Sequence, residues 1–189
     1  ADNNTAVGYA SLGANTTGIN NTALGRTSLE NNTTGDRNTA LGEAALRDNT
    51  ASNNTAVGTG ALTANTTGTQ QVAVGRSALT NNTTANYNTA VGYLALNTNT
   101  TGSFNTGLGR SALQYNTTGG GNVAVGDTAL WQNTEGNYNV AVGIGALDAN
   151  TTADDNIAVG TAALGANTTG ASNVAVGKDA LKTNTTGYQ

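Results

Sequence analysis

The chain has 189 residues, a net charge of −4, and no cysteine, histidine, methionine or proline. Charged residues make up only 10% of it, and its seven lysines and arginines form no basic stripe, so it lacks the electrostatic pattern of a nucleic-acid-binding protein. No apolar run reaches the roughly 18 residues of a membrane-spanning helix, so we expect no membrane insertion by this segment. Without an imidazole base or a thiol nucleophile, we expect no enzyme, no catalytic residues, no metal site and no cofactor.

One 17-residue unit is repeated eleven times along the chain. Its consensus is Asn-Thr/Val-Ala-Val/Leu-Gly-x-x-Ala-Leu-x-x-Asn-Thr-Thr-Gly-x-x, and the only irregular step is the one of 16 residues from Leu41 to Val57. Periods of this size are typical of solenoids, in which each unit buries its apolar face against its neighbours. The sequence therefore predicts an all-β fold, a parallel β-solenoid of eleven coils. It forms a single domain, residues 1–189, which we interpret as a segment of a longer protein.

Each repeat begins with a short predicted strand, as in residues 122–126. Side chains alternate across a strand, so Val123 and Val125 share one face and Ala124 takes the other. The Ala position holds alanine in ten repeats and Gly107 in the remaining one, which indicates either a narrow coil interior or close approach to another chain. We expect the interior of each coil to contain one leucine, two alanines, and one or two Val, Ile or Thr side chains.

Glycine follows the strand in every repeat and is predicted to close it, because the backbone there has a positive φ or lacks room for a Cβ. These glycines are Gly8, Gly25, Gly42, Gly58, Gly75, Gly92, Gly109, Gly126, Gly143, Gly160 and Gly177. A second set, with softer steric limits because Ala85 and Ala153 replace two members, closes the next corner. It contains Gly18, Gly35, Gly68, Gly102, Gly119, Gly136, Gly170 and Gly187.

The Ala-Leu segment lies between the two sets of glycines, and its leucine is present in every repeat. A side chain placed once per coil stacks on its equivalents as a ladder, so we assign it to the core. We interpret this segment as a second short strand, although a 3₁₀ turn is an alternative. The ladder contains Leu12, Leu29, Leu46, Leu62, Leu79, Leu96, Leu113, Leu130, Leu147, Leu164 and Leu181.

Asparagine precedes each strand, except for Gln71, and also opens each Asn-Thr-Thr corner. We expect these amides to hydrogen-bond the backbone of adjacent coils. The corners also contain Asn-x-Thr glycosylation sequons, which we interpret as turn chemistry rather than as glycan sites. The sequons include Asn15, Asn32, Asn65, Asn82, Asn99, Asn116, Asn150, Asn167 and Asn184. The corner threonines form a regular rank, which leaves an ice-binding role as an alternative.

The candidate surface-binding residues are the aromatic side chains of four neighbouring repeats. An exposed aromatic cluster stacks on sugar rings or anchors a protein partner, whereas the alternative is scattered surface or interchain aromatics. The candidates are Trp131, Tyr138, Tyr115, Phe104 and Tyr87. The single carboxylate pair Asp154–Asp155 is interpreted as a solvated loop rather than as an acid/base pair or a calcium site.

The Asn-Val-Ala-Val-Gly motif at residues 122–126, 139–143 and 173–177, with counterparts in every coil, resembles the head repeat of YadA-type trimeric autotransporter adhesins. Similar arrays occur in phage tail-fibre-like proteins, and the resemblance spans the whole chain, with a longer period here. It implies a left-handed parallel β-roll and three chains packed side by side. The expected location is extracellular, at a cell surface or on a virion.

We therefore expect a rigid shaft or head of an adhesive fibre that self-associates as a homotrimer or as an end-to-end filament. Its other expected partner is a host surface or a glycan, and nucleic acid is not expected. The alternative function is an ice-binding β-solenoid that uses its threonine ranks.

Overall fold

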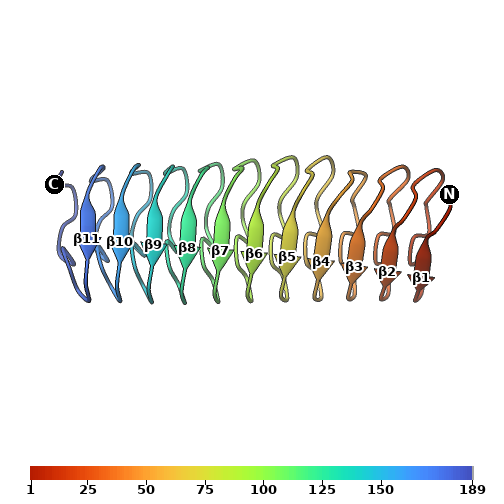
Figure 1. Ribbon diagram of the computed structural model, residues 1–189, viewed down its shortest axis with the longest axis horizontal. Coiled ribbons are helices and arrows are strands. Elements are labelled where there is room, and N and C mark those ends of the chain that lie inside the picture. The colour runs from red at the N-terminus through yellow and green to blue at the C-terminus, as the bar shows by residue number, and fades with distance from the viewer. Residues whose placement is uncertain (189) are drawn as a thin grey trace.

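The computed structural model describes residues 1–188 and confirms the parallel β-solenoid. Eleven strands of three residues each lie side by side in one sheet, in chain order, and the two termini lie at opposite ends of the rod (Figure 1). The described residues contain no helix. The strands are β1 (Thr5–Val7), β2 (Thr22–Leu24), β3 (Thr39–Leu41), β4 (Thr55–Val57), β5 (Val72–Val74), β6 (Thr89–Val91), β7 (Thr106–Leu108), β8 (Val123–Val125), β9 (Val140–Val142), β10 (Ile157–Val159) and β11 (Val174–Val176).

Adjacent strands pair in parallel with equivalent residues opposite each other, as Ala23 of β2 does with Ala40 of β3. The backbone hydrogen bonds continue on both sides of the strand: Thr22 N donates to Asn38 O at 2.8 Å, and Gly25 N donates to Val7 O at 2.9 Å. With about 4.8 Å between neighbouring strands, the sheet is roughly 50 Å long. Identical positions therefore form straight ranks along the whole rod.

The Ala-Leu segment is not a second strand, so that prediction is wrong. The ladder leucines have φ between 47° and 54°, in the left-handed region, and the residue two positions earlier is also left-handed, as at Ala44 with φ 56°. An extended strand is incompatible with these angles. The segment is a series of turns in which Asn49 N donates to Leu46 O at 3.2 Å, while Leu46 N reaches the next coil and donates to Ala61 O at 3.0 Å.

The interior of each coil is filled by leucine, alanine and asparagine. Nine of the ladder leucines are fully buried, which confirms the leucine core, and only Leu12 and Leu181 at the ends are partly exposed. The strand alanines point inward as well: a Cβ built on Gly107 would lie 3.5 Å from Leu96 Cδ1. Of the two explanations for the small residue in the strand, the narrow coil interior is correct. The Val, Ile and Thr residues of the strands point outward, so their predicted place in the core is wrong.

Two buried asparagine ladders replace those side chains, as the sequence predicted for the amides. In the first ladder, which precedes the strands, Asn21 Nδ2 donates to Gly35 O at 2.8 Å, and Asn21 Oδ1 accepts from Asn38 N at 2.9 Å. Gln71 continues this ladder in coil 5, where its Oε1 accepts from Asn88 N at 3.0 Å. These amides satisfy backbone groups that have no partner in the sheet.

The second ladder lies at the Asn-Thr-Thr corner. Asn99 Nδ2 donates to Asn82 Oδ1 of the preceding coil at 3.0 Å and to Gly102 O of its own corner at 2.9 Å. Asn99 Oδ1 in turn accepts from Asn116 Nδ2 at 2.7 Å. Each buried amide therefore holds its own turn and binds the coils on both sides of it.

The two sets of glycines have different causes. Those after the strands have φ between 128° and 140°, and at Gly126 a Cβ would also lie 2.6 Å from Gly143 O, so both predicted reasons apply. The corner glycines have no such φ, but a Cβ on Gly35 would collide with Ala51 O and Asn32 Oδ1. Ala51, Ala85 and Ala153 stand at this place in three coils, which shows that some corners accommodate a methyl group.

The 16-residue repeat lacks one residue in its Asn-Thr-Thr corner, which begins at Asn49. Asn49 Nδ2 donates to Ala51 O, two residues on, at 2.7 Å, whereas Asn32 Nδ2 donates to Gly35 O, three residues on, at 3.0 Å. The missing residue is thus the second threonine of the corner. Thr39 of β3 still pairs with Thr55 of β4, so the deletion leaves the register of the sheet unchanged.

We expect Asn82→Ala to lower the free energy of unfolding by about 2 kcal/mol, because buried polar groups without partners cost about 1–3 kcal/mol each. The substitution removes the partner of Asn99 Nδ2, at 3.0 Å, and of Asn65 Oδ1, at 2.9 Å. Urea unfolding measures the loss. The neighbouring exposed Asn81 is the control, and Asn81→Ala should cost at most about 0.5 kcal/mol. Equal effects at the two positions would contradict the role of the buried ladder.

Candidate binding surfaces

The outward face of the sheet is the first candidate surface, which we call the strand face. It consists of the first and third residues of every strand, β1 to β11. The first rank contains Thr5, Thr22, Thr39, Thr55, Val72, Thr89, Thr106, Val123, Val140, Ile157 and Val174, and the second contains Val7, Leu24, Leu41, Val57, Val74, Val91, Leu108, Val125, Val142, Val159 and Val176. Leu24 and Leu108 are each 46% exposed, so large apolar side chains stay in contact with water in the middle of the rod as well as at its ends.

The corner threonines are bound to the backbone. Thr117 Oγ1 donates to Thr134 O of the next coil at 2.9 Å, and Thr134 Oγ1 donates to Thr151 O at 3.0 Å. The same bond recurs at 2.8 Å from Thr16 to Thr33. The first threonine of the corner therefore links successive coils, and only the oxygen lone pairs of its hydroxyl remain for a ligand.

The sequon asparagines lie in the corner ladder, in agreement with their interpretation as turn chemistry. Asn32, Asn65, Asn82, Asn99, Asn116, Asn150 and Asn167 are all 0% exposed. In Asn116, for example, Nδ2 donates to Asn99 Oδ1 and to Gly119 O, which uses both amide hydrogens. Attachment of a glycan to such a nitrogen is incompatible with the folded coil.

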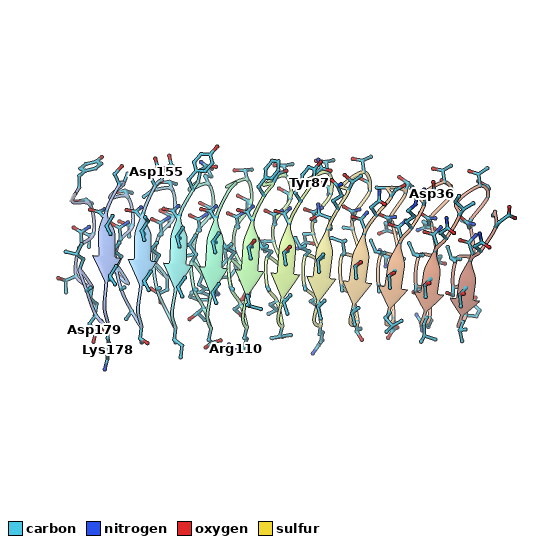
Figure 2. All side chains as sticks on the ribbon, in the orientation of Figure 1. Asp36, Tyr87, Arg110, Asp155, Lys178 and Asp179 are labelled. Carbon is cyan, nitrogen blue, oxygen red and sulfur yellow. The ribbon has the colours of Figure 1, made fainter. Side chains whose placement is uncertain are left out.

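The five candidate aromatic residues form two separate groups. Tyr87, Phe104 and Tyr138 make up the first, which we call the corner aromatics, because each directly precedes a buried asparagine and has φ between 56° and 62°. The Tyr87 and Phe104 rings are stacked, with centroids 5.0 Å apart and planes 6° apart. Tyr138 extends its ring over Gly121, where a Cβ would collide with it at 2.6 Å. In Figure 2, Tyr87 lies at the same edge of the rod as Asp36 and Asp155.

Tyr115 and Trp131 form the second group, on the returning segment that follows the ladder leucine. Their ring centroids are 5.3 Å apart and their planes are tilted by 58°. Trp131 Nε1 donates to Gln114 Oε1 at 3.2 Å, which fixes the indole. Together with Gln132 and four threonines they line an open groove of about 510 Å³, which we call the Trp131 groove. Its threonines are Thr98, Thr117, Thr134 and Thr151.

The repeat phase would have separated these groups, since Tyr115 and Trp131 follow a ladder leucine and the corner aromatics precede an asparagine. The threonines of the groove were missed: Thr117, Thr134 and Thr151 are not distinguishable in sequence from the other corner threonines, and Thr98 lies at the variable repeat position that Tyr115 occupies in the next coil. The aromatic neighbours alone make this stretch of the rank different.

Charged side chains pair along the rank that follows the strand glycines. Arg110 Nε lies 2.8 Å from Asp127 Oδ1, and Arg26 Nε lies 3.7 Å from Glu43 Oε1, both on the exposed surface. Figure 2 shows Arg110 at the edge of the rod opposite Tyr87. Such exposed pairs contribute little to stability.

Two aspartates elsewhere on the rod have shifted pKa values. A hydrogen bond from Arg47 lowers the pKa of Asp48, and burial raises the pKa of Asp148.

Asp154 and Asp155 do not act as a pair. Asp154 Oδ1 accepts from Asn137 N at 2.6 Å and so caps a turn of the preceding coil, while Asp155 is exposed with φ 58°. Among residues 1–188, no three His, Cys, Asp or Glu side chains come close enough to hold a metal ion. The part of the chain that the structure describes also lacks any helix long and apolar enough to cross a membrane.

No family model, curated protein or solved structure is significantly similar to this chain.

Proposed function

We propose that this chain is a rigid, non-enzymatic segment of an extracellular fibre, the shaft or head of a bacterial surface adhesin or a phage tail fibre. The observation that carries the proposal is the in-register stacking of all eleven coils, in which each strand pairs with the next. Two buried amide ladders and a leucine core bind the same coils together along the same axis. A rod of this kind keeps a fixed length and holds a repeated surface at a distance from its anchor.

Self-association through the strand face is part of the proposal. The face presents apolar side chains in every coil, among them Leu41 at 38% and Leu108 at 46% exposure, and contiguous apolar surface of this kind favours protein contacts. The alanine rank is buried inside its own coil, so of the two faces of the sheet only the strand face is available for side-by-side packing. Three parallel copies, each turning this face toward the common axis, form the fibre.

Light scattering across a dilution series tests the assembly, and we expect a mass near three times 18.7 kDa. Leu41→Lys combined with Leu108→Lys should give a monomer, because charges on an apolar interface lose their hydration. The matched control places lysines at the exposed corner positions Thr34 and Thr118 and should keep the trimer. A monomeric parent chain would overturn the side-by-side trimer, and a mass that grows without limit would favour the end-to-end filament.

Ice binding is the second candidate, and the threonines of the strand face favour it. Six strands (β1–β4, β6 and β7) begin with an outward threonine, and the third residue of each is valine or leucine, so hydroxyl and methyl groups lie side by side on this part of the sheet. We expect thermal hysteresis in this case, and its loss in Thr55→Tyr combined with Thr106→Tyr. The corner variant Thr34→Tyr combined with Thr118→Tyr should retain it. A parent chain without hysteresis excludes this function.

A further inference from the structure

The Trp131 groove has a fixed aromatic corner. The Tyr115 and Trp131 rings meet at 58°, so they form two walls rather than one stacked block. The hydrogen bond from Trp131 Nε1 to Gln114 Oε1 of the preceding coil, at 3.2 Å, and the half-buried position of the indole fix one wall. Tyr115 remains 42% exposed. Aromatic faces of this kind favour flat ligands that have C–H groups on one side.

The polar part of the groove consists of hydrogen-bond acceptors that are already oriented. Thr98 Oγ1 donates to Gln114 O at 2.8 Å, Thr117 Oγ1 to Thr134 O at 2.9 Å, and Thr134 Oγ1 to Thr151 O at 3.0 Å. Since each hydroxyl hydrogen is bonded to a backbone oxygen of the next coil, each hydroxyl oxygen presents lone pairs to a ligand that donates. The exposed amide of Gln132 adds donors and an acceptor at the same place.

The groove lining contains no charged side chain. A ligand that matches this lining is neutral, carries several hydroxyl donors, and has an apolar face for the aromatic corner. A pyranose ring has this combination, since its axial C–H groups form one face and its hydroxyls project from the rim. An acyclic polyol lacks the face, and an acidic sugar brings a charge that has no partner here.

We propose that the Trp131 groove is a binding site for a neutral pyranose sugar, with the ring against Tyr115 and Trp131 and its hydroxyls donating to the threonines of the groove. The inference deepens the proposed adhesive function and rests on it. The site is confined to coils 6 to 9, because the other coils lack the aromatic corner. The contact that each fibre makes with a glycan surface is then multiplied by the number of chains in the fibre.

Trp131 is the only tryptophan of the chain, so its fluorescence reports on this groove alone. The test titrates methyl β-D-glucopyranoside and methyl β-D-galactopyranoside into the full chain. We expect a saturable change in emission for at least one of them, with half-saturation at about 1–10 mM, the range for a ligand of this size. Sorbitol and glucuronate at the same concentrations should give no saturable change.

Three variants locate the binding. Tyr115→Ala should weaken it by about tenfold, and Gln132→Leu, which keeps the size and removes the amide, by about threefold. Tyr138→Ala, in the corner aromatics, is the matched control and should leave the affinity unchanged. The thermal unfolding midpoint of each variant is measured as well, so that a misfolded variant is recognised. If Tyr115→Ala does not fold, Gln132→Leu provides the test.

The absence of a saturable signal up to about 100 mM, far above the expected range, would overturn the sugar site. So would an equal response to sorbitol, or equal weakening by Tyr138→Ala. The light-scattering mass separates this failure from that of the fibre: a trimer without sugar binding leaves the fibre proposal in place. A monomer that binds sugar through Tyr115 would keep the site and remove the fibre assembly.

Discussion

Gly126→Ala is expected to lower the free energy of unfolding by about 4 kcal/mol, because two costs of about 1–3 kcal/mol each act at this position. The backbone has φ +138°, which side-chain-bearing residues rarely adopt. The new Cβ would also lie 2.6 Å from Gly143 O and 2.7 Å from Gly143 C, atoms of the next coil's backbone. Relief of that contact requires the two coils to move apart, which breaks the ladder bonds between β8 and β9.

Gly177→Ala is the matched control for this experiment. Gly177 has nearly the same φ, +128°, but a Cβ there would meet only Ala180 Cβ, at 4.0 Å. The dihedral cost remains and the steric cost does not, so we expect a loss of about 1–2 kcal/mol. Urea unfolding of the two variants separates the two costs. Equal losses would show that the dihedral alone requires glycine after the strands.

The shape of the urea curve carries a second expected result. Each coil contacts only its neighbours, so a defect between coils 8 and 9 weakens one interface and leaves the blocks on either side intact. Gly126→Ala should therefore split a single transition into two, or lower its slope. Gly177→Ala, at the end of the stack, should shift the midpoint and keep the slope.

The period and the leucine ladder were sufficient to predict the fold, because a side chain repeated at a fixed phase in every coil has to stack on itself. The inner face of the strand was harder. Alternation separates Val123 and Val125 from Ala124 without saying which side is buried, and hydrophobicity favours the valines. The width of the coil decides the matter. Leu96 and its equivalents fill the interior up to the sheet, so only alanine or Gly107 fits opposite.

The left-handed leucines could not be predicted from propensity. A residue with a Cβ pays about 1–2 kcal/mol in that conformation, and leucine visits it rarely. Each of these leucines is buried in a ladder and its N–H bonds the next coil, as Leu46 N does at 3.0 Å to Ala61 O. Burial of a leucine side chain is worth about 1.5–3 kcal/mol, which offsets the backbone cost. Tertiary packing therefore overrides local preference in every coil.

The sequence singled out the two aromatic residues of the Trp131 groove, but neither its threonines and Gln132 nor the separation of the five aromatics into two groups. Trp131, Tyr115, Tyr138, Phe104 and Tyr87 were considered as one cluster because they fall in neighbouring repeats. The stacking of coils brings together residues at the same position of successive repeats, whereas residues close in sequence can lie at different corners of one coil. Tyr87 and Phe104 are one full repeat apart and therefore at the same repeat position, and their rings stack with centroids 5.0 Å apart. Tyr115 and Trp131 are separated by one residue less than a full repeat, and their rings meet at an angle of 58°.

Leu96→Ala is expected to lower the free energy of unfolding by about 3–4 kcal/mol, within the range of about 2–5 kcal/mol for buried leucines. Leu96 is fully buried and is the only large apolar side chain of its rung in the interior. Gly107 faces it and has no Cβ to fill the space left behind, so the cavity cannot close. Urea unfolding at several protein concentrations measures the loss, which should not depend on concentration, since the cavity lies within one chain.

Leu108→Ala is the matched control, because it removes the same atoms from the strand face, where Leu108 is 46% exposed. In an isolated chain this variant should cost at most about 1 kcal/mol. In a fibre whose strand face is covered by a second and third copy, the cost rises and becomes concentration-dependent, because stability is then coupled to assembly. The two leucines thus distinguish burial inside one chain from burial between chains. A loss at Leu108 that matches the loss at Leu96, and that disappears on dilution, would place the strand face at the interface.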